Sequence, residues 1–150
     1  MNGWLLAAAL VLGGGVGAAL WGVATGPLRR RAVAQNLCTA LACPALLLLA
    51  QGYDRPAYVD LALVLALLGP VGTLVFARLL ADELAADPPR AWGLTWAAAG
   101  LGAVVVLVLC ATVGPSRAMV KLLVTGALLI AGNVVASHAL SGGFAGVRGG

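Results

Sequence analysis

The sequence predicts an all-α membrane protein with five transmembrane helices, the N-terminus outside and the C-terminus inside. Of its 150 residues, 62% are apolar and only 9% are charged, whereas a soluble domain carries about a quarter charged residues. The mean hydropathy is +1.04, and a chain this small cannot hide so much apolar surface from water. A free-standing soluble enzyme, a secreted disulfide scaffold and a disordered tail are therefore excluded.

Five apolar stretches are each long enough to cross a bilayer, which takes about 20 helical residues. We expect helices over about residues 4–25, 32–51, 57–80, 92–113 and 118–140. A hydrophilic run at 82–90 is the best candidate for a linker, and a glycine-rich tail follows the fifth helix.

The distribution of basic residues predicts the orientation, because loops on the inner side of a membrane are rich in Arg and Lys. With the N-terminus outside, six basic residues lie inside and three outside. The inner set is Arg29, Arg30, Arg31, Arg78, Arg90 and Arg148, and the outer set is Arg55, Arg117 and Lys121.

Glycine and proline mark the helix-packing positions. Gly13 and Gly17 form a GxxxG pair, which lets another helix approach closely. Pro44 and Pro70 each remove a backbone donor and should kink their helices. In lipid the freed carbonyls need partners from neighbouring helices or trapped water. Such kinks either open a polar pocket or serve packing alone.

Asp60 is the most informative polar residue, because it lies near the outer start of the third span with apolar residues running on for four turns. An ionisable group at the centre of a membrane helix costs about 2.5–3.5 kcal/mol on insertion scales, and less near an end. Two interpretations are open: Asp60 belongs to an ion pathway, or it reaches solvent at the interface, paired with Arg55.

The second and fifth spans carry the remaining polar candidates. Arg31, Asn36 and Thr39 form a polar patch at the start of the second span, and Asn133 and His138 lie near the end of the fifth. Amides in a bundle commonly join helices by hydrogen bonds, and the alternative is a lining for an ion or water path. A single His near a helix end is more often an interface residue than a proton relay.

No enzyme, cofactor or metal site is expected. The cysteines Cys38, Cys43 and Cys110 lie in apolar runs and fit buried small side chains, and no ligand cluster, catalytic triad or phosphate loop is present. Basic residues interleaved with aromatics are missing, so no nucleic-acid partner is expected. The middles of all five spans lack acids and bases, which argues against a self-sufficient proton-coupled pump.

Residues 52–69, which contain Asp60, followed by Val71-Gly72-Thr73, resemble the last helix of the F subunit (MrpF) of Mrp-type multisubunit Na+/H+ antiporters. Gly26-Pro27 and the run from Arg31 to Asn36 resemble the junction between that subunit's first two helices. The chain differs from the family at Asn36, where the family has an acid, and at Pro70, where it has Phe.

The C-terminal part is similar to the closing helix of the G subunit over Lys121-Leu122-Leu123 and residues 133–140. The basic and acidic motif of that subunit is missing. The resemblances predict an F-like three-helix unit over residues 1–85. Residues 86–150 are then a linker, a two-helix G-like extension and the tail.

The resemblance implies an accessory integral-membrane subunit of a multisubunit monovalent cation/proton antiporter in the bacterial plasma membrane. Its expected partners are the other membrane subunits, the lipid bilayer, and Na+ or K+ and H+ as transported ions. The resemblance carries over Asp60 as a pathway candidate. The polar pattern of the spans adds Asn36 and Arg31, with Thr39, Asn133 and His138 as weaker candidates. The alternative is a structural subunit of a membrane-bound hydrogenase or complex I-like assembly without a transport role.

Overall fold

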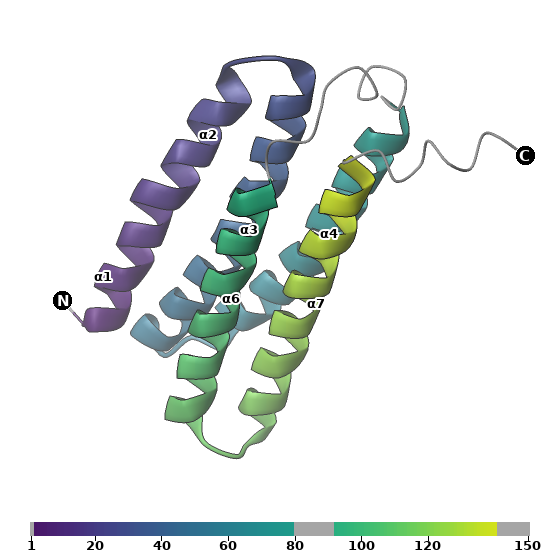
Figure 1. Cartoon of the computed structure of the whole chain (residues 1–150). Coiled ribbons are helices and arrows are strands. Elements are labelled where there is room, and N and C mark those ends of the chain that lie inside the picture. The colour runs from purple at the N-terminus through teal and green to yellow at the C-terminus, as the bar shows by residue number, and fades with distance from the viewer. Residues whose placement is uncertain (1, 80–91, 141–150) are drawn as a thin grey trace, which may run out of the picture.

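The computed structural model describes residues 2–79 and 92–140 as an all-helical bundle (Figure 1). The first long helix consists of α1 (Gly3–Leu10), the π-helical segment η1 (Val11–Val16) and α2 (Gly17–Ala24). The others are α3 (Leu28–Tyr53), α4 (Ala57–Leu79), α6 (Trp92–Val113) and α7 (Arg117–Leu140). Within the described residues, five helices are long and apolar enough to cross a membrane.

The expected helix bounds agree with the structure to within four residues. The largest difference is at α3, which begins at Leu28 rather than at residue 32, so the three arginines belong to its first turns and not to a loop. The linker expected at 82–90, the boundary at 85/86 and the glycine-rich tail lie outside the described residues.

Short connections make successive helices antiparallel. Gly26, with φ of +99°, and Pro27 separate α2 from α3. Asp54 adopts the left-handed conformation, with φ of 52°, directly after α3. Gly114, with φ of +69°, ends α6 ahead of Pro115. Positive φ carries no steric penalty at glycine, and Asp tolerates it better than most residues.

Helix α3 is the centre of the bundle, and it contacts the first helix, α4, α6 and α7. The α6–α7 hairpin packs on both α3 and α4, while the first helix rests on α3 at the edge of the bundle (Figure 1). The two C-terminal helices therefore form one body with the N-terminal three.

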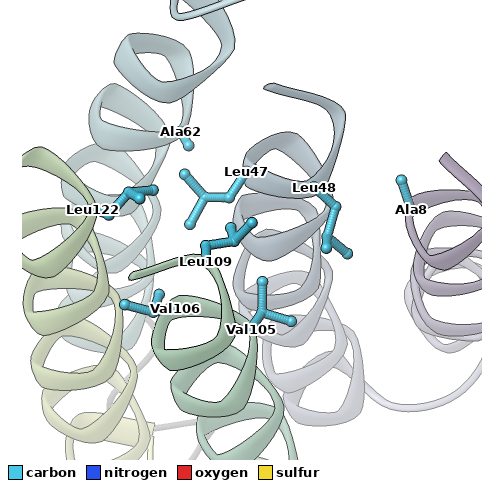
Figure 2. Close-up of a cluster of buried hydrophobic side chains, with 8 residues drawn as sticks. All are labelled: Ala8, Leu47, Leu48, Ala62, Val105, Val106, Leu109 and Leu122. Carbon is cyan, nitrogen blue, oxygen red and sulfur yellow. The ribbon is translucent and has the colours of Figure 1, made fainter. Parts of the chain in front are cut away.

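The main apolar cluster draws on the first helix, α3, α4, α6 and α7 (Figure 2). Leu47 of α3 and Leu109 of α6 are each 1% exposed at its middle, and Leu48 lies on the side of α3 that faces Ala8 of α1. The cluster consists of Ala8, Leu47, Leu48, Ala62, Val105, Val106, Leu109 and Leu122.

Small residues allow the helices to approach at specific points. A Cβ on Gly132 of α7 would overlap the ring of Pro70 on α4, and one on Gly69 would overlap Thr39 of α3. In the first helix, a Cβ on Gly15 would stand 3.1 Å from the Leu41 side chain of α3. These contacts place the backbones of α3, α4 and α7 close together around Pro70.

The predicted GxxxG pair lies on a different face of the first helix. Gly13 has nothing within 4 Å of where a Cβ would stand, and Gly17 meets there only a carbonyl of its own helix. Both are exposed. The approach to α3 is made by Gly15 and Gly22 instead, with Leu41 and Ala34 as their neighbours. Packing at Gly13 and Gly17 therefore stays a prediction that concerns a partner chain.

Candidate functional site

Two asparagine side chains from distant parts of the chain meet inside the bundle. The Nδ2 of Asn36 on α3 donates to the Oδ1 of Asn133 on α7 at 2.8 Å. Asn36 is 6% exposed and Asn133 is 3% exposed. Both lie on helices that are otherwise largely apolar, so packing those helices together buries the amides along with their apolar neighbours.

Hydroxyl groups and a backbone carbonyl extend this pair to all four of the helices α3, α4, α6 and α7. The Thr73 hydroxyl of α4 lies 3.4 Å from Asn36 Oδ1 and also donates to its own helix backbone. The Nδ2 of Asn133 donates to the Thr95 carbonyl of α6 at 3.2 Å, and Ser137 Oγ bonds Thr95 Oγ1 at 3.3 Å. We call these five residues the amide cluster.

The amide cluster lies within the membrane-crossing length of the bundle. Asn36 is eight residues into α3, which places it about 12 Å from that helix end at 1.5 Å per residue. Hydrogen bonds between membrane helices contribute about 0.6 kcal/mol on average and up to about 1.7 kcal/mol. The cluster thus favours one relative orientation of these helices, which apolar packing alone would leave poorly defined.

A small cavity of about 10 Å³ adjoins the asparagine pair, between α3, α4 and α7. Polar and apolar groups share its wall. Its lining residues are Asn36, Thr39, Ala40, Ala66, Pro70, Leu129 and Asn133. A volume of about 10–15 Å³ open to a water centre is enough for one water molecule.

The structure brings together four of the sequence-derived candidates: Asn36, Thr39, Pro70 and Asn133 all line this cavity. The Thr39 hydroxyl donates to the Gln35 carbonyl at 3.3 Å. Pro44 is fully buried one turn beyond Ala40 on α3.

Three members of the amide cluster, Thr73, Thr95 and Ser137, were not among the candidates. Each is a single hydroxyl residue in a largely apolar stretch, and that is the only signal the sequence offers. Thr95 contributes through its carbonyl as well as its hydroxyl, and a backbone contribution leaves no trace in sequence.

Asp60 lies elsewhere, at the opposite end of the bundle from the amide cluster. It sits in the first turn of α4 and accepts from Lys121 Nζ of α7 at 3.0 Å. The proposed pairing with Arg55 is therefore wrong. The partner is Lys121 of the neighbouring helix α7, which lies beside Asp60 at the same end of the bundle. Both side chains are 59% exposed, so this is a surface ion pair.

The other candidates lie on exposed surface. Arg31 donates from Nε to the Gly26 carbonyl at 3.1 Å and so braces the turn before α3. His138 is exposed in the last turn of α7, next to Ser137. Neither residue lines the cavity.

Within residues 2–79 and 92–140, charge is confined to helix ends and turns. Every charged side chain whose exposure is described there is exposed. In the same part of the chain, no group of three His, Cys, Asp or Glu side chains could hold a metal ion. In these residues the interior is polar only through neutral amides, hydroxyls, carbonyls and the Cys43 thiol, which donates to the Ala62 carbonyl.

Residues 30–81 match the family model of multiple resistance and pH regulation protein F (MrpF / PhaF). The match supports the resemblance to MrpF that the sequence indicates. No curated protein and no solved structure matches the chain.

The MrpF match begins at α3 and takes in α4. It therefore contains Asn36, the cavity residues of those two helices, and Asp60. It does not contain Asn133 or Lys121, the side chains that pair with Asn36 and Asp60. The C-terminal hairpin, whose likeness to the G subunit stays a prediction, supplies both partners.

Proposed function

We propose that this chain is an accessory membrane subunit of a multiple resistance and pH regulation antiporter, a multisubunit monovalent cation/proton antiporter. The observation that carries the proposal is the MrpF match over residues 30–81, the segment that contributes Asn36 to the buried amide cluster. In this proposal the chain supports assembly of the complex, and its polar residues contribute to the cation path.

The charge distribution supports an accessory role. A protein that moves protons by itself needs a titratable group inside the membrane, and the described interior contains only neutral polar groups. The acids and bases that carry protons would then belong to larger partner subunits.

The test of assembly is affinity purification of the tagged chain from its native membrane. We expect larger multi-span subunits to be recovered with it, and deletion of the gene to lower tolerance to sodium or potassium. Recovery as a homogeneous monomer, with cation tolerance unchanged on deletion, would rule the proposal out.

The role of Asp60 is tested by Asp60→Asn, with Asp54→Asn as a matched control. Both acids are exposed, and Asn is tolerated at the left-handed Asp54. We expect Asp60→Asn to lower antiport while the complex still assembles. Lys121→Gln breaks the same ion pair but keeps the acid, so equal losses in both variants would assign Asp60 a structural role only.

Orientation and domain boundaries form a finer part of the proposal. We infer an N-out, C-in topology in a bacterial plasma membrane, from the six inner and three outer basic residues. In this scheme residues 1–85 form the F-like unit and 86–150 the G-like extension.

Thiol labelling of intact cells tests the topology. Cysteine at exposed Ser116 should react with an impermeant reagent, and cysteine at exposed Leu28 should not, in a background without Cys38, Cys43 and Cys110. The reverse pattern would contradict the proposed orientation.

A second candidate function is favoured by Asn36 itself. The residue stands where the family resemblance places an acid, and its amide is engaged by the neutral Asn133. A structural subunit of a hydrogenase-like or complex I-like assembly needs no ion at this point. In that case deletion would remove a partner from the complex and leave cation flux unchanged.

A further inference from the structure

Two prolines on neighbouring helices each leave one backbone carbonyl without its helical donor, and both carbonyls belong to residues that line the same cavity. Pro44 has no N–H to give to the carbonyl of Ala40, and Pro70 has none for the carbonyl of Ala66, since each lies four residues further on. Ala40 and Ala66 both line the cavity between α3, α4 and α7. The Ala66 oxygen also faces Gly132 of α7, 3.6 Å from where a Cβ would stand.

The same cavity has spare donors. An asparagine Nδ2 carries two hydrogens. Asn36 directs one of them to Asn133, and Asn133 directs one to the Thr95 carbonyl. Each amide therefore keeps a second N–H. The Thr39 hydroxyl gives its hydrogen to the Gln35 carbonyl, so its oxygen can still accept.

From these groups we propose that the cavity between Asn36, Pro70 and Asn133 is a binding site for one water molecule. The water donates to the acceptors released by the prolines and accepts an N–H from the asparagine pair. The volume of about 10 Å³ suits a single water. Three hydrogen bonds are the usual number for a buried water, and in a bilayer interior no other solvent can satisfy these groups.

The charge of the site favours water over a cation. Its lining residues include no carboxylate, so no negative charge is present to offset that of a cation. The spare N–H groups of the two amides would also repel a monovalent cation, whereas a water molecule can both accept from them and donate to the neutral oxygens. The water site rests on the packing of this chain and is independent of the proposed function.

Magic-angle-spinning NMR of the full chain in phosphatidylcholine–phosphatidylglycerol vesicles tests the proposal. The sequence has three asparagines, Asn2, Asn36 and Asn133, so selective ¹⁵N labelling yields three side-chain amides. Exposed Asn2 is the internal reference for bulk water, and the 1%-exposed Leu47 and Leu109 methyl groups are the reference for a dry interior.

We expect water polarisation to reach the Asn36 and Asn133 amides well before it reaches the Leu47 and Leu109 methyl groups. Transfer no faster than to those methyl groups would overturn the proposal. Exchange of NaCl for choline chloride should leave the two amide signals in place. A shift of both signals on removal of sodium would also overturn it, because the ligand would then be the cation.

Ala40→Val provides a second measurement. Ala40 is buried and lines the cavity, so two added methyl groups should displace the water. Rapid transfer to Asn36 and Asn133 should be lost while transfer to Asn2 is kept. Ala127→Val, on an exposed face of α7, is the control and should change neither. If Ala40→Val folds and water polarisation still reaches the Asn36 and Asn133 amides rapidly, the proposed water site is contradicted. If the variant does not fold, the comparison of amide and methyl transfer in the wild-type protein is the test.

Discussion

The asparagine pair should be energetically coupled, and a double-mutant cycle measures this coupling. Asn133→Ala removes two hydrogen bonds between helices, one from Asn36 and one to the Thr95 carbonyl. Asn36→Ala removes the shared bond and an interaction with Thr73, whose hydroxyl keeps the Gly69 carbonyl as an acceptor. The two substitutions therefore share one bond of 2.8 Å.

The expected losses of unfolding free energy follow from the number of hydrogen bonds that each substitution removes. At about 0.6–1.7 kcal/mol per bond between membrane helices, Asn133→Ala should lower the free energy of unfolding by about 1–3 kcal/mol. Asn36→Ala should lower it by about 1–2 kcal/mol on the same scale. The double variant should lose less than the sum of the two, by about 0.6–1.7 kcal/mol, because the shared bond is lost only once.

Reversible unfolding by SDS in mixed micelles, followed by circular dichroism and tryptophan fluorescence, measures these changes. Asn133→Ala combined with Thr112→Val is the control pair, since the Thr112 hydroxyl bonds the Leu109 carbonyl of its own helix at the other end of the bundle. The control pair should be additive within about 0.3–0.5 kcal/mol. Additivity of the Asn36 and Asn133 changes to the same degree would refute the buried pair.

Two further predictions concern the packing of α4 and α7. Gly132→Ala should lower the free energy of unfolding by about 1–3 kcal/mol because its Cβ would overlap Pro70. Gly13→Ala, which meets open space, is the control and should be neutral or stabilising by up to about 1 kcal/mol, so equal losses would contradict the close approach. Asp60→Asn and Lys121→Gln should each change unfolding in the same SDS assay by no more than about 1 kcal/mol, because the pair is exposed. A larger loss would mean that the pair is desolvated in the folded protein.

The helices themselves could be predicted from the sequence, because a span is a local property: about 20 apolar residues bounded by Gly, Pro or charge. Polar residues inside those spans were also detectable one by one, and Asn36, Thr39 and Asn133 were identified in this way. The sequence distance between Asn36 and Asn133 is 97 residues, and nothing local indicates that they touch.

The sequence does not indicate which face of each helix packs against its neighbours. The GxxxG spacing identified a small-residue face on the first helix, but α3 packs against Gly15 and Gly22. Similarly, Arg55 is close to Asp60 in sequence, while Lys121, 61 residues away, is the residue that bonds it. In both cases the outcome depends on which side each helix turns toward its neighbour, which tertiary packing decides.

The few polar contacts between helices influence how the α6–α7 hairpin packs on the rest of the bundle. Lipid is as apolar as leucine, so apolar faces alone give membrane helices little preference for one partner over another. Here the α6–α7 hairpin meets the MrpF-like helices α3 and α4 at the Asn36–Asn133 bond near one end and the Asp60–Lys121 pair at the other. Two polar contacts at different levels, together with the close approach of Gly132 to Pro70, favour one register and one rotation of the hairpin. The apolar faces that this leaves outward, including Gly13 and Gly17, remain available for lipid and for the larger subunits that the proposed function requires.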